Sequence, residues 1–191
     1  MSAPLLSPGE LTVWSRYIHE LCGVYLDDSK GYLVEARLGD LVRETGSHSF
    51  TELLAKVRAD LTQTLPRKVI DAITTNETSF FRDAAPFELL RSRLIPELIE
   101  RRHQAGRRPV PIRIWSAACS TGQEAYSTAM VLKEVLGDFR GYDIRILGTD
   151  ISDQAITQAS YAHFNRLDLA RGLTPSQLPR HSEPAGDRWK P

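Results

Sequence analysis

The sequence lacks most of the features that would assign a chain to a broad class at once. Its 191 residues hold 24 Lys plus Arg against 24 Asp plus Glu, and this zero net charge argues against a protein that coats nucleic acid or an anionic membrane. No run of about 18 apolar residues occurs, and residues 1–10 do not resemble a secretory signal, so we expect no membrane insertion. The two cysteines, Cys22 and Cys119, are far apart, which predicts reduced thiols and a cytoplasmic location.

Metal-ligand patterns are also missing. The five histidines are scattered, at His19, His48, His103, His163 and His181. None of them has a Cys, His or carboxylate partner at the spacing of a known metal motif, so we expect no metal site. The overall composition, 41% apolar and 25% charged, is that of an average globular protein.

Helical periodicity dominates the first third of the chain. Ser7 and Glu10 have the spacing of a capping box, with Pro8 at the first helical position. Apolar residues then recur at helical spacing over four segments, residues 11–22, 33–42, 50–57 and 65–73. This pattern predicts a small all-α domain over residues 1–75, with a domain boundary where the periodicity stops.

The second part of the chain, residues 76–191, begins with one more helical pattern. It runs from Asp83 to about His103, and Pro96 inside it predicts a kink or a break. A basic stretch, residues 101–111, is expected to be a loop.

The predicted secondary structure changes from helices alone to strands and helices after this loop. Residues 112–115 and 143–147 have the composition of strands, and residues 124–136 between them have the pattern of a helix. The first strand leads into a run of small residues, Ser116 to Gly122, and the second leads into Asp150. This order predicts a βαβ nucleotide-binding unit within an α/β domain.

The βαβ segment indicates what such a unit would bind. Small residues after the first strand let a ligand approach the backbone, and the carboxylate of Asp150 can accept hydrogen bonds from both ribose hydroxyls. The glycine fingerprint for a pyrophosphate is absent, which disfavours a nicotinamide oxidoreductase and favours a phosphate-free adenosine such as S-adenosylmethionine. The same residues also fit simple helix-on-strand packing with Asp150 as a solvated helix start.

Three stretches in this region resemble the CheR family of chemotaxis-receptor methyltransferases. They are residues 76–83 (NETSFFRD), 114–124 (IWSAACSTGQE) and 148–152 (GTDIS), and they occur in the family's order and spacing. The resemblance extends over residues 1–75, which are similar to the family's helical domain. It also extends over residues 171–189, which are similar to the segment that follows in the family. It implies a small all-α domain followed by part of a Rossmann-like methyltransferase domain.

The resemblance also implies site residues. The cofactor S-adenosylmethionine, and its product S-adenosylhomocysteine, would contact a set drawn from all three stretches: Asn76, Thr78, Arg82, Ala118, Glu124 and Asp150. Arg82 would lie nearest the transferring methyl group and would be the catalytic residue. Gln123 and Ala125 depart from the family pattern, which usually has an acid and a proline there. Phe80 and Phe81 are expected to pack in the core. Cys119 is expected to occupy the loop because its side chain is small, rather than to act as a catalytic thiol.

The activity that the resemblance implies is methyl transfer to glutamate carboxylates in the cytoplasmic domain of a chemotaxis receptor, giving methyl esters. The family's sheet has seven strands, and this sequence stops at Pro191 before the later ones, so we expect a truncated product or fragment. The alternative function is therefore a module that binds receptor or cofactor without turnover. An incomplete sheet of this kind could also pair with a second copy of the chain.

Overall fold

The computed structural model describes residues 5–186 and 188–191, and the chain divides into two compact units. One unit comprises Met1–Thr75 with Ile151–Asp153, and the other comprises Asn76–Asp150 with Gln154–Pro191. Within the described residues, no helix is both long and apolar enough to cross a lipid bilayer.

The first unit is built from helices, as the periodicity predicted. These are α1 (Pro8–Cys22), the short 3-10 helix η1 (Asp28–Lys30), α2 (Gly31–Glu44), α3 (Phe50–Ala59) and α4 (Thr64–Ile73). The predicted capping box is present at Ser7 and Glu10. Trp14 is fully buried at the centre of the unit, and its indole N–H donates to the carbonyl of Phe50 at 3.0 Å. An apolar core of buried side chains from these helices therefore holds them together.

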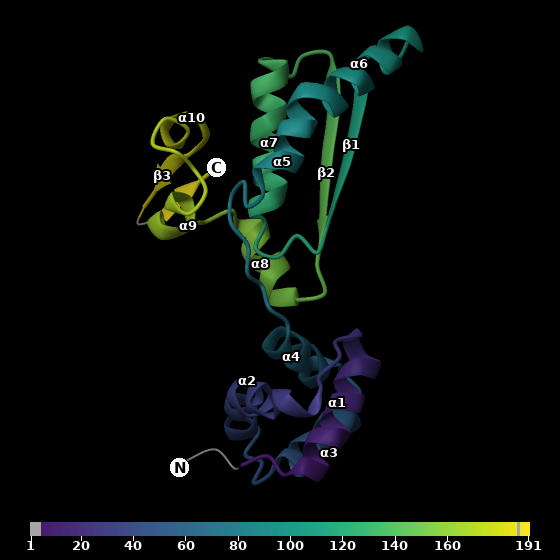
Figure 1. The fold of residues 1–191 in the computed structure, drawn as a ribbon, viewed down its shortest axis with the longest axis vertical. Coiled ribbons are helices and arrows are strands. Elements are labelled where there is room, and N and C mark those ends of the chain that lie inside the picture. Colours follow the sequence, from purple (N-terminus) through teal and green to yellow (C-terminus); the bar gives the residue numbers. More distant parts are fainter. Residues whose placement is uncertain (1–4, 187) are drawn as a thin grey trace. The chain divides into compact units, whose positions relative to one another are not determined.

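The second unit contains a parallel pair of strands, β1 (Val110–Ala117) and β2 (Tyr142–Thr149), joined by α7 (Gln123–Leu136). The strands pair over their full length, from Val110 opposite Tyr142 to Ala117 opposite Thr149. Helices α5 (Ala84–Leu89), α6 (Ile95–Gln104) and α7 cover one face of this sheet (Figure 1). The other face is open, and Trp115 and Leu147 are 68% and 61% exposed there. The α/β class predicted for this region is confirmed.

The expected break near Pro96 is a π-helical segment, η2 (Leu90–Leu94), between α5 and α6. Proline has no N–H to donate and its ring crowds the carbonyl four residues earlier, here that of Ser92, so the wider π turn relieves the contact. The expected loop over residues 101–111 is too long, because α6 continues to Gln104 and β1 already begins at Val110.

The last part of the chain forms short elements: α8 (Asp153–Tyr161), α9 (Arg166–Ala170), α10 (Leu178–His181), β3 (Glu183–Ala185) and β4 (Arg188–Lys190). The sequence predicts a helix capped by Ser152 and running through Ala159, which agrees with α8. The elements after it have no periodicity that would predict them. The elements from α9 onward pack on the side of α7 away from the sheet, where Leu169 and Leu173 share a core cluster with Met130 (Figure 1). The predicted core position of Phe80 is confirmed, because it is fully buried in the same cluster.

A charged network fastens α10 to α7. The buried His181 places its Nε2 atom 3.1 Å from Glu134, and Arg91 donates to the other oxygen of that carboxylate at 2.6 Å. Partial burial alone would raise the pKa of Glu134, but the contacts with Arg91 and His181 outweigh it, and the pKa is lowered from 4.5.

This network predicts a pH-dependent contribution to stability. A carboxyl group whose pKa is lowered by folding stabilises the fold above its unfolded pKa, and the contribution disappears as the pH falls through the folded value. Glu134→Gln should therefore be less stable than the natural chain by about 1 kcal/mol at pH 7. This difference in stability should shrink as the pH falls below 4.5, the ordinary pKa of a glutamate.

Denaturant unfolding between pH 7 and pH 3 measures this difference. Glu97→Gln is the matched control, because Glu97 pairs with Arg93 on an exposed helix face, where an ion pair contributes little. A Glu134→Gln difference that stays constant across this range would contradict the assignment.

Candidate functional site

The loop between β1 and α7 has a strained backbone. Ala118, Ser120 and Gly122 have φ angles of 56°, 50° and 96°, in the left-handed region. For the two residues with a side chain this costs on the order of 1 kcal/mol each. Gly122 has a packing reason as well, since an added Cβ would lie 3.0 Å from the Cβ of Ala159. The loop turns tightly enough to bring its backbone N–H groups to the end of the sheet.

Asp150 lies at the same end of the sheet, directly after β2. Its Oδ2 atom accepts the backbone N–H of Ser120 at 2.8 Å. The backbone N–H of Cys119 donates to the carbonyl of Thr149 at 2.9 Å and joins the loop to the second strand. Two expectations are thus confirmed: the strands are adjacent, and Asp150 faces the small-residue loop. Asp150 is half-buried.

Glu124 stands on the first turn of α7, on the exposed side of the loop. Its Oε1 atom accepts the hydroxyl of Ser116, from the end of β1, at 2.7 Å. Ala118 is also exposed, so its small side chain leaves the loop accessible. The structure thus places Ala118, Glu124 and Asp150 around one loop.

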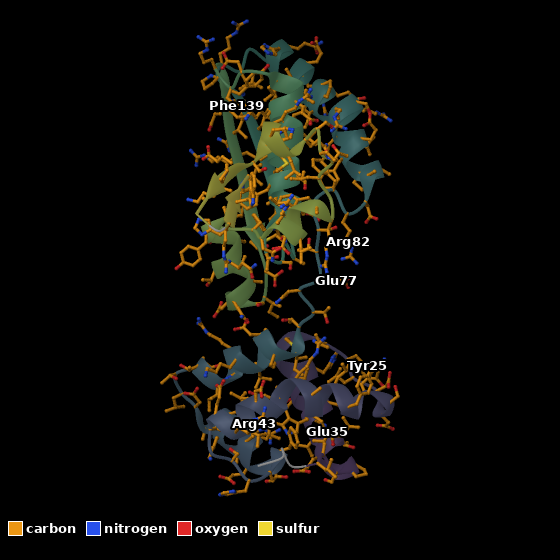
Figure 2. The ribbon with its side chains drawn as sticks, turned by 90° about the vertical axis from the view of Figure 1, so that its left-hand side faces the viewer. Tyr25, Glu35, Arg43, Glu77, Arg82 and Phe139 are labelled. Carbon is orange, nitrogen blue, oxygen red and sulfur yellow. The ribbon has the colours of Figure 1, made fainter. Side chains whose placement is uncertain are left out.

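The segment preceding α5 contributes the remaining predicted residues. The carbonyl of Asn76 accepts the Ser120 hydroxyl at 2.9 Å, which places Asn76 at the loop. Arg82 is exposed, and its Nη1 atom donates to the carbonyl of Glu77 at 2.8 Å; Figure 2 shows this side chain projecting outward. Within the described residues, Arg82 forms no salt bridge with Asp83 or with Glu88, and Glu88 pairs with Arg91. Its guanidinium is accessible to an anion.

A polar cavity of about 320 Å³ opens beside this segment. Asn76 and Thr78 line it together with Gln154 and Gln158 of α8 and with Arg171. The remaining predicted site residues, Arg82, Ala118, Glu124 and Asp150, do not line this cavity. The structure therefore brings Ala118, Glu124, Asp150 and Asn76 together at the loop. Thr78 shares the cavity with Asn76, whereas Arg82 extends from the same segment without lining the cavity.

Cys119 lies in the loop but is unsuited to nucleophilic chemistry. Burial raises the pKa of its thiol, and the nearby carboxylates of Asp150 and Glu124 raise it further. The thiol is therefore protonated at neutral pH, whereas the thiolate is the reactive form. In the part of the chain that the structure describes, no group of three or more metal-ligating side chains lies together.

Sequence reasoning missed the hydroxyl groups that hold the site together. Ser116 and Ser120 belong to the small-residue run, in which the sequence indicates only their small size. In the structure their hydroxyls donate to Glu124 and to the carbonyl of Asn76. Gln154 and Gln158 were missed too, although their spacing of four residues on the helix after Asp150 is a signal that both face one side.

A parallel βαβ unit with a small-residue loop and an acid after its second strand is typical of Rossmann-like domains that bind nucleosides. Comparison with protein families is more specific. Residues 76–190 match the SAM binding domain of CheR methyltransferase, and residues 9–74 match the all-alpha domain of CheR methyltransferase. The chain therefore belongs to the CheR methyltransferase family, as its motifs predicted.

Several curated proteins are similar to the chain. A chemotaxis protein methyltransferase of Pseudomonas putida is 39% identical over 178 residues, which cover 91% of this chain and 62% of the relative. One of Vibrio anguillarum is 39% identical over 189 residues, which cover 98% of this chain and 66% of the relative. One of Borreliella burgdorferi is 34% identical over 155 residues, 81% of this chain and 54% of the relative. The chain thus spans less than two thirds of the length of these relatives.

Proposed function

We propose that this protein binds S-adenosylmethionine and transfers its methyl group to glutamate carboxylates of a chemotaxis receptor. The observation that carries the proposal is the hydrogen bond between Asp150 and the backbone N–H of Ser120. It joins the acid after β2 to the loop after β1, and these are the two parts that a bound adenosine needs. The family match and the names of the relatives support the reaction class.

The residues around the loop fit S-adenosylmethionine. A carboxylate has about four acceptor sites, so Asp150 can hold the Ser120 N–H and still accept ribose hydroxyls. The exposed Ala118 leaves room for close approach of the ligand, and Glu124 offers an exposed carboxylate for its amino group. No pyrophosphate contact is required, which agrees with the single glycine of the loop.

Arg82 would orient the acceptor. When bound, S-adenosylmethionine supplies an activated methyl group on a sulfonium, and a glutamate carboxylate, with an ordinary pKa near about 4.3, is already ionised at neutral pH. The protein therefore needs no general base, and catalysis rests on alignment and on exclusion of water. An arginine fork can fix a carboxylate at two points, and the exposed guanidinium of Arg82 is accessible to such a group.

The proposed substrate sets the proposed location. Glutamates of the receptor's cytoplasmic domain would be modified in the cytoplasm, and we place the protein there on that ground. The names of the relatives support chemotaxis as the process.

The role of Asp150 predicts a change in affinity. Asp150→Ala should weaken binding of S-adenosylhomocysteine by about tenfold or more, because hydrogen bonds to a charged group are lost. Isothermal titration calorimetry measures this. Asp138→Ala, which removes an exposed carboxylate paired with Arg140, is the control and should leave the affinity unchanged. Equal affinities for the Asp150 variant and the natural chain would remove Asp150 from the site.

The role of Arg82 predicts a change in rate. Arg82→Ala should lower turnover in a labelled-methyl transfer assay by about 100-fold, because an unaligned acceptor reacts slowly, while cofactor affinity changes little. Arg93→Ala removes another exposed arginine, which pairs with Glu97 four residues along the chain, and serves as the control. Parallel losses of turnover and affinity would argue against an orienting role.

The alternative function is binding without turnover. A chain that binds S-adenosylhomocysteine and receptor but transfers no methyl group would support this alternative. The transfer assay on the natural chain distinguishes the two functions directly.

The sheet supports a second proposal, self-association. In the described residues β1 and β2 pair only with each other, and Trp115 and Leu147 are exposed on the open face.

Light scattering should give a mass above that of one chain, and Leu147→Lys should reduce it. Leu167→Lys, at an exposed leucine of α9, is the matched control. A monomeric natural chain would contradict the proposal.

A further inference from the structure

We infer that Ser120, Ser127 and Gly172 are positioning residues that hold the backbone of residues 76–82 in place for cofactor and acceptor. The inference rests on the proposed function, since this segment carries Asn76, Thr78 and Arg82. None of the three positioning residues needs to touch a ligand. Each contacts the backbone of the segment at a different point.

Ser120 supports the start of the segment. Its hydroxyl donates to the carbonyl of Asn76 at 2.9 Å, while its backbone N–H donates to Asp150 at 2.8 Å. One residue in a left-handed conformation thus links the acid after β2 to the first residue of the segment. Because the hydroxyl of Ser120 makes the contact with Asn76, Ser120→Ala removes this contact and keeps the N–H that donates to Asp150.

Ser127 supports the end of the segment from α7. It is fully buried, and its hydroxyl oxygen accepts the backbone N–H of Phe81 at 3.0 Å. The same hydroxyl donates to the carbonyl of Gln123, at the start of α7, at 2.7 Å. Phe81 has a φ of 48°, so the chain turns sharply immediately before Arg82. The serine fixes this turn, and the turn sets the direction in which Arg82 leaves the backbone.

Gly172 supports the segment by its lack of a side chain. A Cβ added there would lie 1.8 Å from the carbonyl oxygen of Phe80 and 2.9 Å from its Cα atom. Neither backbone atom can move freely, because the ring of Phe80 is fully buried against Phe164, with ring centroids 5.0 Å apart. An alanine at residue 172 must therefore displace the backbone immediately before Phe81 and Arg82.

Three single substitutions test the inference in the full chain. Ser120→Ala and Ser127→Ala each remove a hydroxyl, and Gly172→Ala adds a methyl group. Ser92→Ala is the serine control, because that exposed hydroxyl donates to the carbonyl of Glu88, four residues earlier across the junction of α5 and η2. Gly9→Ala is the glycine control, because nothing lies within 4 Å of an added Cβ there.

Four properties of each protein are measured: the affinity for S-adenosylhomocysteine by calorimetry, the melting temperature, and both the NMR signals and the hydrogen exchange of the Phe81 and Arg82 amides. Both serine variants should bind S-adenosylhomocysteine about tenfold more weakly, the equivalent of one hydrogen bond. Ser127→Ala should also expose the Phe81 amide to faster exchange. The ligand-induced shift of the Arg82 amide signal should be lost in each serine variant, a change that a general loss of stability would not cause.

Two results would overturn the inference. If the natural chain binds S-adenosylhomocysteine and both serine variants bind it within twofold of that affinity, the supports do not position the site. If Ser127→Ala leaves the exchange of the Phe81 amide unchanged, the buried hydrogen bond does not hold the segment. The exchange measurement needs no ligand, so it tests this inference even if the proposed function is wrong. Failure of the proposed function would instead appear as an unsubstituted chain that does not bind S-adenosylhomocysteine. If Gly172→Ala does not fold, the serine variants still decide.

Discussion

The parallel pairing of β1 with β2 is the constraint on which the candidate site depends. Pairing that runs in register from Val110 with Tyr142 to Ala117 with Thr149 brings both strand ends to one edge of the sheet. The loop that begins at Ala118 and the acid Asp150 must then meet, although about 30 residues separate them in the chain. Buried aliphatic side chains between the sheet and α7, such as Ile112 and Val131, hold this register from one side.

The strain of the loop is balanced by hydrogen bonds from the same residues. Left-handed φ angles at Ala118 and Ser120 are unfavourable for residues with side chains. They are tolerated because they aim the Ser120 N–H at Asp150 and its hydroxyl at Asn76. The conformation that costs stability is therefore the one that gathers the acid, the loop and the preceding segment into one site. A flatter turn would separate them.

The sequence predicted those parts of the fold that repeat and missed those that depend on single contacts. Leu11, Trp14 and Ile18 recur at helical spacing, so α1 could be predicted, and strand order alone placed Asp150 at the loop. The strands β3 and β4 have three residues each, too few for any period to show. Ser127 within a helix and Gly172 in a turn carry no pattern of their own. Their importance is visible only from the backbone atoms that they meet in three dimensions.

The most direct test of this account is a crystal structure of the chain grown with S-adenosylhomocysteine. The ribose hydroxyls should lie within hydrogen-bond distance of the Asp150 carboxylate, with the Ser120 N–H still donating to the same group. The adenosine should lie over the loop that contains Ala118. A nucleoside bound elsewhere on the chain, with Asp150 making no contact to its sugar, would contradict it.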